Sequence, residues 1–469
     1  RDRAFHLNKN LKIYGGFVGT ETMLSERDWK NNSTILSGDF NGDDEVSGSG
    51  SSLTISNTTE NAYHVFITTG LDSTTLIDGF TVEGGNADGD FSSISYDGKI
   101  FFRALGGGMY NDTSSPSISN TAFSRNSADE GGGMHNDNAS PSISNTSFSE
   151  NSAVDGGGVC NFDSSPKITN TAFSRNSADL GGGMYNISSS PGISNTTFSE
   201  NSADEGGGMF NEDSSPKITN TTFSGNTATS DGGGMFNEDS SPSITNSSFS
   251  ENSADEGGGM HNDNASPNIT NTTFSGNTAT SDGGGVYNFD SSPKITNTTF
   301  SGNTATSDGG GMFNEDSSPS ITNSSFSENS ADEGGGLYNF DSSPIVNNTV
   351  FYRNTASSRG PDIDGNIHFS SAHNASDGTG GGINSGTGFI NLSLSGVTSS
   401  TLFVNPADPD GPDDVWRTAD DGLIPAAGSP LTDTGSNTLL PADITDLDSD
   451  NDTSEAIPFD STGAARIQG

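Results

Sequence analysis

Three apolar positions recur at a fixed spacing through the middle of the chain. From Gly106 to about Ala356, ten consecutive segments of 25 or 26 residues share the pattern GGGM-x-N, SSPxI and FSxN. Met109, Ile118 and Phe123 begin three columns that stay apolar in every later segment. A repeat of this length is typical of solenoids, and short apolar runs between Gly, Pro, Asn and Ser are typical of strands and turns. The pattern predicts an all-β, right-handed, single-stranded parallel β-helix with three short strands in each coil.

The flanking regions predict irregular coils of the same solenoid. We expect one continuous domain, with irregular coils over residues 1–105, a loop leaving the barrel near residues 84–103, and ten regular coils over residues 106–355. Residues 356–469 lose the period and end in an Asp-rich tail. The short apolar runs outside the array bring the expected total to roughly 17 to 19 coils.

Composition alone would predict a different class of protein. The chain is 28% hydrophobic and carries a formal charge of -44, a profile that is typical of disordered proteins. The period outweighs this signal, because three inward residues per coil, stacked about 4.8 Å apart on those of the next coil, suffice for a continuous core. The 61 acidic against 17 basic residues exclude nucleic acids and anionic membranes as expected partners. No apolar stretch is long enough to span a membrane.

Two asparagine columns and one cysteine complete the repeat. The columns that begin at Asn111 and Asn126 are expected at turns, with their amides bonded to one another along the solenoid axis. The GGG run is expected where positive φ or close approach excludes larger residues. Cys160 is the single cysteine and excludes an internal disulfide framework. It occupies a column otherwise filled by Tyr, His and Phe, and we interpret it as an incidental substitution.

The paired motifs resemble a known family. GGGM or GGGV together with FSxN is similar to the GGA(I/L/V) and FxxN repeats of polymorphic outer-membrane proteins, which are β-helical surface adhesins. The flanks, LKIYGGFVGTET near the start and AAGSPL near the end, resemble secreted right-handed β-helix proteins of bacteria. The resemblance implies a bacterial protein that is secreted or exposed at the cell surface, and it implies no enzyme activity.

The repeat itself also argues against catalysis. Every acid in the array recurs in register, whereas a catalytic site needs one asymmetric cleft. We therefore expect no catalytic residues and no organic cofactor. Because parallel β-helices also include pectate lyases and polygalacturonases, a carbohydrate-binding or polysaccharide-cleaving β-helix is the alternative. Ice binding by rows of Thr and Ser is a third hypothesis.

Carboxylates at alternate positions are candidates for Ca²⁺ ligands, because Ca²⁺ prefers oxygen ligands. The first set is Asp446, Asp448, Asp450, Asp452 and Glu455. The second set is Asp408, Asp410 and Asp413, and a third, smaller set is Asp39, Asn41 and Asp43. Two further columns of acids flank each GGG run; they are interpreted as a solvated stripe, with a ladder of bound cations as the alternative.

An aromatic column follows the Met column by one residue. By strand alternation it should point away from the core, where it would form an exposed contact stripe for lateral association or ligand stacking; packing under a neighbouring loop is the alternative. The stripe consists of Tyr110, Tyr185, Phe210, Phe236, Tyr287, Phe313 and Tyr338.

The combined reading is an extracellular structural or adhesive β-solenoid. Its expected partners are further copies of itself, or glycans and other groups at a cell surface. The more specific hypothesis is a self-assembling subunit of a surface filament or layer. It is motivated by the start at Arg1 without the expected N-terminal cap, since an open coil end offers unpaired backbone groups.

Overall fold

The computed structural model describes residues 1–96, 98–368, 370–378, 387–392, 399–405, 412, 423–432, 434–440, 442–443 and 455–456. The chain forms two compact units. Unit 1 contains Arg1–Pro242 and Asn252–Ala254, and unit 2 contains Ser243–Glu251 and Asp255–Gly469. Each unit is described by itself below.

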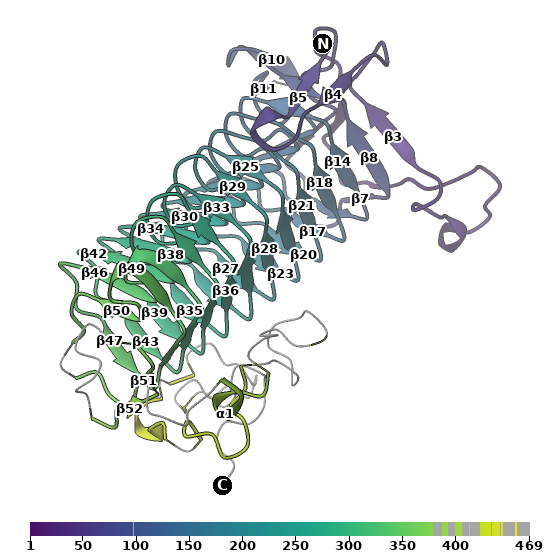
Figure 1. Cartoon of the computed structure of the whole chain (residues 1–469). Coiled ribbons are helices and arrows are strands. Elements are labelled where there is room, and N and C mark those ends of the chain that lie inside the picture. Colours follow the sequence, from purple (N-terminus) through teal and green to yellow (C-terminus); the bar gives the residue numbers. More distant parts are fainter. Residues whose placement is uncertain are drawn as a thin grey trace. The chain divides into compact units, whose positions relative to one another are not determined.

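Unit 1 is built from three parallel sheets in which strands from successive coils lie side by side, as β14, β18 and β21 do in Figure 1. The first sheet contains β1 (Phe5–Leu7), β6 (Phe66–Thr69), β12 (Met109–Asp112), β16 (Met134–Asp137), β19 (Val159–Phe162), β22 (Met184–Ile187), β26 (Met209–Glu212) and β30 (Met235–Glu238). The second contains β2 (Lys12–Tyr14), β7 (Leu76–Asp78), β13 (Ser117–Ser119), β17 (Ser142–Ser144), β20 (Lys167–Thr169), β23 (Gly192–Ser194) and β27 (Lys217–Thr219). The third contains β3 (Thr34–Ser37), β8 (Phe80–Glu83), β14 (Ala122–Ser124), β18 (Ser147–Ser149), β21 (Ala172–Ser174), β24 (Thr197–Ser199) and β28 (Thr222–Ser224).

Unit 2 repeats the same three sheets. The first contains β34 (Met260–Asp263), β38 (Val286–Phe289), β42 (Met312–Glu315), β46 (Leu337–Phe340) and β50 (Ile363–Asp364). The second contains β31 (Ser243–Thr245), β35 (Asn268–Thr270), β39 (Lys294–Thr296), β43 (Ser320–Thr322) and β47 (Ile345–Asn347). The third contains β32 (Ser248–Ser250), β36 (Thr273–Ser275), β40 (Thr299–Ser301), β44 (Ser325–Ser327), β48 (Val350–Tyr352), β51 (Ala375–Ser376) and β52 (Ile390–Asn391).

Short elements complete the coils. Brief parallel strands precede the GGG runs: in unit 1 β9 (Asn86–Ala87), β15 (Ser127–Ala128), β25 (Ser202–Ala203), β29 (Thr227–Ala228) and β33 (Ser253–Ala254), and in unit 2 β37 (Thr278–Ala279), β41 (Thr304–Ala305), β45 (Ser330–Glu333) and β49 (Thr355–Arg359). Two antiparallel hairpins, β4 (Glu45–Ser47) with β5 (Thr54–Ser56) and β10 (Ser93–Tyr96) with β11 (Lys99–Phe102), leave the coils of unit 1. The helical turns among the described residues are η1 (Leu24–Glu26), η2 (Gly50–Ser52), α1 (Ser399–Leu402) and η4 (Asn437–Leu439).

The register confirms the predicted three-strand coil. Met109 pairs with Met134, Ile118 with Ile143, and Phe123 with Phe148. Each of these side chains is fully buried. Stacked phenylalanine rings of unit 1 lie nearly parallel, with centroids 4.6–4.9 Å apart, which is the spacing of adjacent strands. The apolar core therefore consists of columns of like residues.

The described residues form fewer coils than predicted. In this part of the chain the first sheet has eight strands in unit 1 and five in unit 2, against the 17 to 19 coils expected. The excess came from counting apolar runs outside the array as coils. Ile55, for example, lies in the antiparallel hairpin β4–β5 and not in a parallel sheet.

The asparagine columns bond along the axis as predicted. The Asn111 amide donates to Asn136 Oδ1 at 2.8 Å, and that of Asn126 donates to Asn151 Oδ1 at 3.0 Å. Both columns are buried. The expected place of the first column was wrong, because Asn111 lies within strand β12 and shares its inward face with Met109.

Other residues make the tight turns of each coil. Asn120 has a φ of 50° and Arg125 a φ of 56°, and the same positions are left-handed in later coils. Gly131 has a φ of 68°, and a Cβ on Gly132 would lie 2.4 Å from the Ser152 carbonyl oxygen. The GGG run thus has both predicted functions: a left-handed bend and close approach between neighbouring coils.

Candidate functional site

The predicted contact stripe is buried. Tyr110, Tyr185, Phe210, Phe236, Tyr287 and Phe313 are at most 6% exposed, and Tyr338 is half-buried. The prediction of an exposed stripe was wrong because the acid-and-glycine segment of each coil folds back over the outer face of the first sheet. A Cβ on Gly131 would lie 2.3 Å from the Met134 carbonyl oxygen and 2.9 Å from His135 Cα. The alternation gave the direction of these side chains correctly, but not the segment that covers them.

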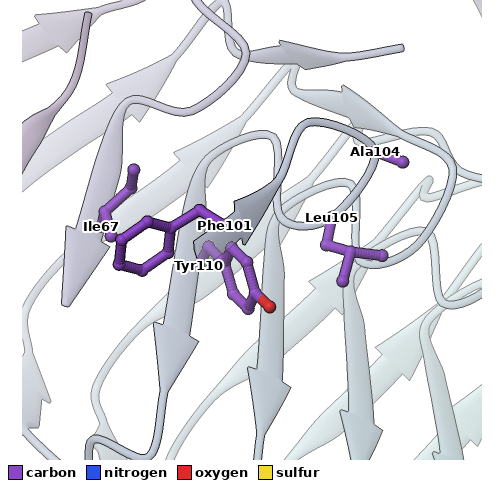
Figure 2. Packing of buried hydrophobic residues seen from close by; sticks show 5 residues of the cluster. All are labelled: Ile67, Phe101, Ala104, Leu105 and Tyr110. Carbon is purple, nitrogen blue, oxygen red and sulfur yellow. The ribbon is translucent and has the colours of Figure 1, made fainter. Parts of the chain in front are cut away.

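The hairpin β10–β11 provides a local cover at the start of the column. Figure 2 shows Tyr110 packed among Ile67, Phe101, Ala104 and Leu105, which together form one buried cluster. The rings of Phe101 and Tyr110 meet edge to face, with centroids 5.8 Å apart and an interplanar angle of 88°. The loop expected near residues 84–103 therefore packs back on the solenoid through Phe101.

Carboxylates gather in the covering segment. We call the row Glu130, Asp155, Leu180 and Glu205 the acidic strip of unit 1; its neighbours are joined by parallel β-bridges. Burial, then the carboxylates of Asp155 and Asp129, raises the pKa of Glu130 to about 7. Burial and the nearby Asp179 raise the pKa of Asp155 to about 6. The strip therefore keeps like charges close together at a cost to the folded state.

The corresponding strip of unit 2 includes Asp308, which forms a β-bridge with Glu333. Burial raises the pKa of Asp308 to about 6, and Asp282 and Glu333 add to the shift, followed by Asp332 and Asp364. Asp282 itself accepts a hydrogen bond from the Asp308 backbone N–H at 2.8 Å.

The tail candidates for Ca²⁺ lie mostly outside the described residues. This holds for Asp408, Asp410, Asp413, Asp446, Asp448, Asp450 and Asp452. Glu455 is described, and its backbone carbonyl accepts a hydrogen bond from the Asp443 N–H at 2.7 Å.

The third, smaller set is brought together in unit 1. One carboxylate oxygen from each of Asp39, Asp43, Asp44 and Glu60 lies within 4.8 Å of the others. Asp39 Oδ1 accepts the N–H groups of the Asn41–Gly42 turn at 3.0 and 2.6 Å. Burial opposes ionisation of Asp39, but these and neighbouring backbone hydrogen bonds outweigh it and lower its pKa. Burial and nearby carboxylates raise the pKa of Asp44. The loop was predicted from the spacing of Asp39, Asn41 and Asp43, whereas Asp44 and Glu60 were not predicted as members of the set.

A groove lies along the corner between the second and third sheets of unit 1. Its volume is ≈ 700 Å³. We call it the Asn–Thr groove. Among the described residues, its lining consists of Trp29, Lys30, Ser33, Gly79, Phe80, Thr81, Asn120, Thr121, Ala122, Asn145, Thr146, Ser147, Asn170, Thr171, Ala172, Asn195 and Thr197. Lys30 is the one charged residue of these seventeen.

The repeat builds this groove from corresponding positions in successive coils. Asn145, with a φ of 49°, makes the bend, and its exposed amide oxygen accepts a hydrogen bond from the Asn170 amide at 3.3 Å. The next residue, Thr146, is buried and donates its hydroxyl hydrogen to the Ser144 carbonyl at 3.0 Å. A small residue, Ser147, then begins the third strand. The wall is therefore a regular row of amides beside small side chains.

The same corner of unit 2 contacts a segment of the chain. The Asn348 amide donates to the Ser436 carbonyl at 3.1 Å and accepts from the Ser436 N–H at 2.9 Å. It also donates to Asn323 Oδ1 at 3.0 Å. The Asn348 amide thus holds the backbone of Ser436 through a pair of hydrogen bonds.

Comparison with known proteins supports the architecture. A family profile described as a right handed beta helix region matches residues 101–253 and 136–304. These residues include most of the regular array, in which the parallel pairing was observed. The chain is a right-handed parallel β-helix protein. No curated protein and no solved structure matches it. None of the helices in the described part of this β-helix has the length and apolar character needed to cross a lipid bilayer.

The groove of the β-helix was not predicted from the sequence. Its signal was present as the repeated Asn-Thr and Asn-Ser steps between the Ile and Phe columns. Asn120 and Asn145 do make turns, and they also present their amides to the groove.

The acidic strip predicts a pH dependence of stability. Asp308 has a folded-state pKa of about 6, above its usual 3.8, so its contribution to stability is present at low pH and is lost as the pH rises through 6. As the pH rises from about 4 to about 7, the free energy of unfolding of Asp308→Asn should therefore increase relative to that of the parent. The expected increase is roughly 1 kcal/mol after allowance for solvent screening. Denaturant unfolding at several pH values measures this change.

The control for this experiment is Asp72→Asn. The hydroxyl and backbone of Thr74 hold the pKa of Asp72 below its usual value, so the stabilisation by Asp72 is present above that usual value and is lost only as the pH falls below about 4. The stability of this variant relative to the parent should therefore stay nearly constant between about pH 5 and pH 7. Equal pH dependence of the two variants would contradict the account of the strip.

Proposed function

We propose that the protein is an extracellular structural or adhesive β-helix that binds uncharged glycans in the Asn–Thr groove. The observation that carries this proposal is the contrast in charge. The chain has a formal charge of -44, yet the described groove lining contains one charged residue and sixteen uncharged ones. A groove kept free of acids on so acidic a protein suits a neutral, polar ligand.

The chemistry of the lining fits sugars. Asn amides both donate and accept hydrogen bonds, and they recur at each coil about 4.8 Å apart. Trp29 lies at the N-terminal part of the lining, with Lys30 Nζ 5.2 Å from its ring centroid. Aromatic faces beside a few polar groups are typical of small-molecule and cofactor sites. The paired hydrogen bonds between the Asn348 amide and the Ser436 backbone in unit 2 support the capacity of an amide in this row to hold a polar group.

Binding is favoured over cleavage at this groove. Glycoside hydrolysis commonly uses two carboxyl groups that flank the scissile bond. No carboxylate is among the described residues of the groove lining. We therefore propose that the groove binds its ligand without cleaving it.

The glycan proposal predicts a loss of affinity in Trp29→Ala. Neutral glucan and mannan oligosaccharides are the probes, and polygalacturonate is the charged comparison. Titration calorimetry should show binding of at least one neutral probe, with affinity reduced by about tenfold or more in the variant because the stacking face is lost.

Phe162→Ala is the matched control, since Phe162 is 40% exposed and lies on β19 outside the groove; its affinity should be unchanged. If no neutral probe binds, or if Trp29→Ala binds as tightly as the parent, the groove assignment is wrong. Release of shorter oligosaccharides would instead support the polysaccharide-cleaving alternative.

Self-assembly is the second candidate function, and exposed apolar side chains favour it. Phe5, Leu11 and Ile35 belong to the first described coil and its surroundings and are 52%, 50% and 53% exposed. Apolar groups that gather on a surface commonly mark contacts. We propose that they contact a further copy of the protein, and that Ca²⁺ at the Asp39, Asp43, Asp44 and Glu60 cluster supports the folded loop.

The assembly proposal predicts a change in sedimentation. The full chain should form concentration-dependent oligomers, more readily with Ca²⁺ than with a chelator, and Ile35→Thr should weaken them because it removes exposed apolar surface. The control Val154→Thr changes a residue that is 47% exposed but distant in sequence from the first coil and should have no effect. A monomer at every concentration, with and without Ca²⁺, would contradict self-assembly.

A further inference from the structure

Three side chains with metal-binding chemistry meet beneath the acidic strip of unit 1. Glu130 lies in the strip, His135 on β16 and Cys160 on the adjacent strand β19. His135 and Cys160 are direct partners in the parallel register. One potential ligand atom from each of the three lies within 4.8 Å of the others. A carboxylate, an imidazole and a thiol are thus gathered in one place.

One ring nitrogen of the histidine in this cluster lacks a hydrogen-bond partner. His135 Nδ1 is buried and unpaired, and the side chain is 3% exposed. Its contact with Glu130 Oε2 is 3.6 Å long, beyond hydrogen-bonding distance. An unpaired buried polar atom costs about 1–3 kcal/mol, so a partner that bonds to this nitrogen would stabilise the site.

A bound cation would also act on the charges of the strip. Glu130 and Asp155 occupy neighbouring positions there, joined by a parallel β-bridge, and a cation beside them would offset the repulsion between their carboxylates. The Cys160 thiol would lose its proton on coordination.

We propose that Glu130, His135 and Cys160 bind a divalent transition-metal ion of the Zn²⁺ class. Sulfur, nitrogen and oxygen ligands together suit Zn²⁺ and its close relatives better than Ca²⁺ or Mg²⁺. Typical Zn–S and Zn–N bonds are about 2.3 and 2.0 Å, so ligand atoms within 4.8 Å of one another require a small inward movement. The role of the ion is to tie two neighbouring coils together beneath the strip.

The chain contains an internal comparison for this site. Residues 129–141 and 255–267 have the same sequence, DEGGGMHNDNASP. In unit 2 the partner of His261 in the parallel register is Tyr287, whereas His135 pairs with Cys160. The Cys160 thiol therefore distinguishes the surroundings of His135 from those of His261. The proposal gives a function to Cys160, which was interpreted from the sequence as an incidental substitution.

The test is a metal titration of the reduced, chelator-treated full chain. Co²⁺ should produce a thiolate charge-transfer band that saturates at one ion per chain, and Zn²⁺ should displace it. Because the sequence contains one cysteine, the band reports on Cys160 alone. Zn²⁺ affinity is then measured by competition with a chromogenic chelator.

Three variants distinguish a site from general acidity. Cys160→Tyr and His135→Phe insert residues that the same column contains at Tyr185 and Phe210, and each should lower Zn²⁺ affinity by at least about tenfold. His135→Phe should also weaken the Co²⁺ band. His261→Phe is the matched control and should leave the band and the affinity unchanged.

Thermal unfolding of each variant in the absence of metal establishes that it is folded. Zn²⁺ affinity equal to that of the parent in Cys160→Tyr or in His135→Phe would overturn the proposal. Equal losses of Zn²⁺ affinity in His135→Phe and His261→Phe would also overturn the proposal, since binding would then not be specific to the site that contains Cys160.

Discussion

Buried amide ladders impose the strictest condition on this β-helix, because a primary amide away from water needs a partner for each of its polar atoms. Asn176 shows how the condition is met. Its Nδ2 donates to Asn201 Oδ1 at 2.9 Å and to the Phe148 carbonyl at 3.0 Å. Its Oδ1 accepts from the side chain and backbone N–H of Asn151 at 2.9 and 3.1 Å. These bonds exist only if neighbouring coils are aligned residue for residue, and a shift by one residue would also turn Phe173 away from the core.

The sequence predicted the core residues, whose positions follow from the period. It did not predict which outward-facing residues are covered, because irregular segments cover them. Met109, Ile118 and Phe123 were placed in the core because their columns repeat and a parallel coil aligns them. Tyr110 was expected at the surface because alternation fixes the direction of a side chain and not what lies above it; Phe101, from an irregular hairpin, covers it. The groove was not predicted because an Asn in a left-handed turn looks the same in the sequence whether or not its amide lines a binding surface.

Charge is distributed unevenly around each coil, so different faces of the coil suit different ligands. Acids gather in the strips beside the GGG runs, where burial raises the pKa of Glu130 and Asp155. The described lining of the Asn–Thr groove has none. Near-identical coils make the groove a repeated surface, suited to a polymer. The Glu130, His135 and Cys160 cluster is the opposite case, since Cys160 is found once in the chain.

The measurement that tests the role of the ladders most directly is the free energy of unfolding of Asn176→Ala against Asn170→Gly. The first removes a buried amide and leaves groups on Asn151, Asn201 and Phe148 unpaired, so it should cost roughly 2–4 kcal/mol. The second removes an exposed amide and preserves the left-handed turn, so it should cost less than about 1 kcal/mol. Equal, small losses in both variants would contradict the claim that buried amide ladders hold the coils in register.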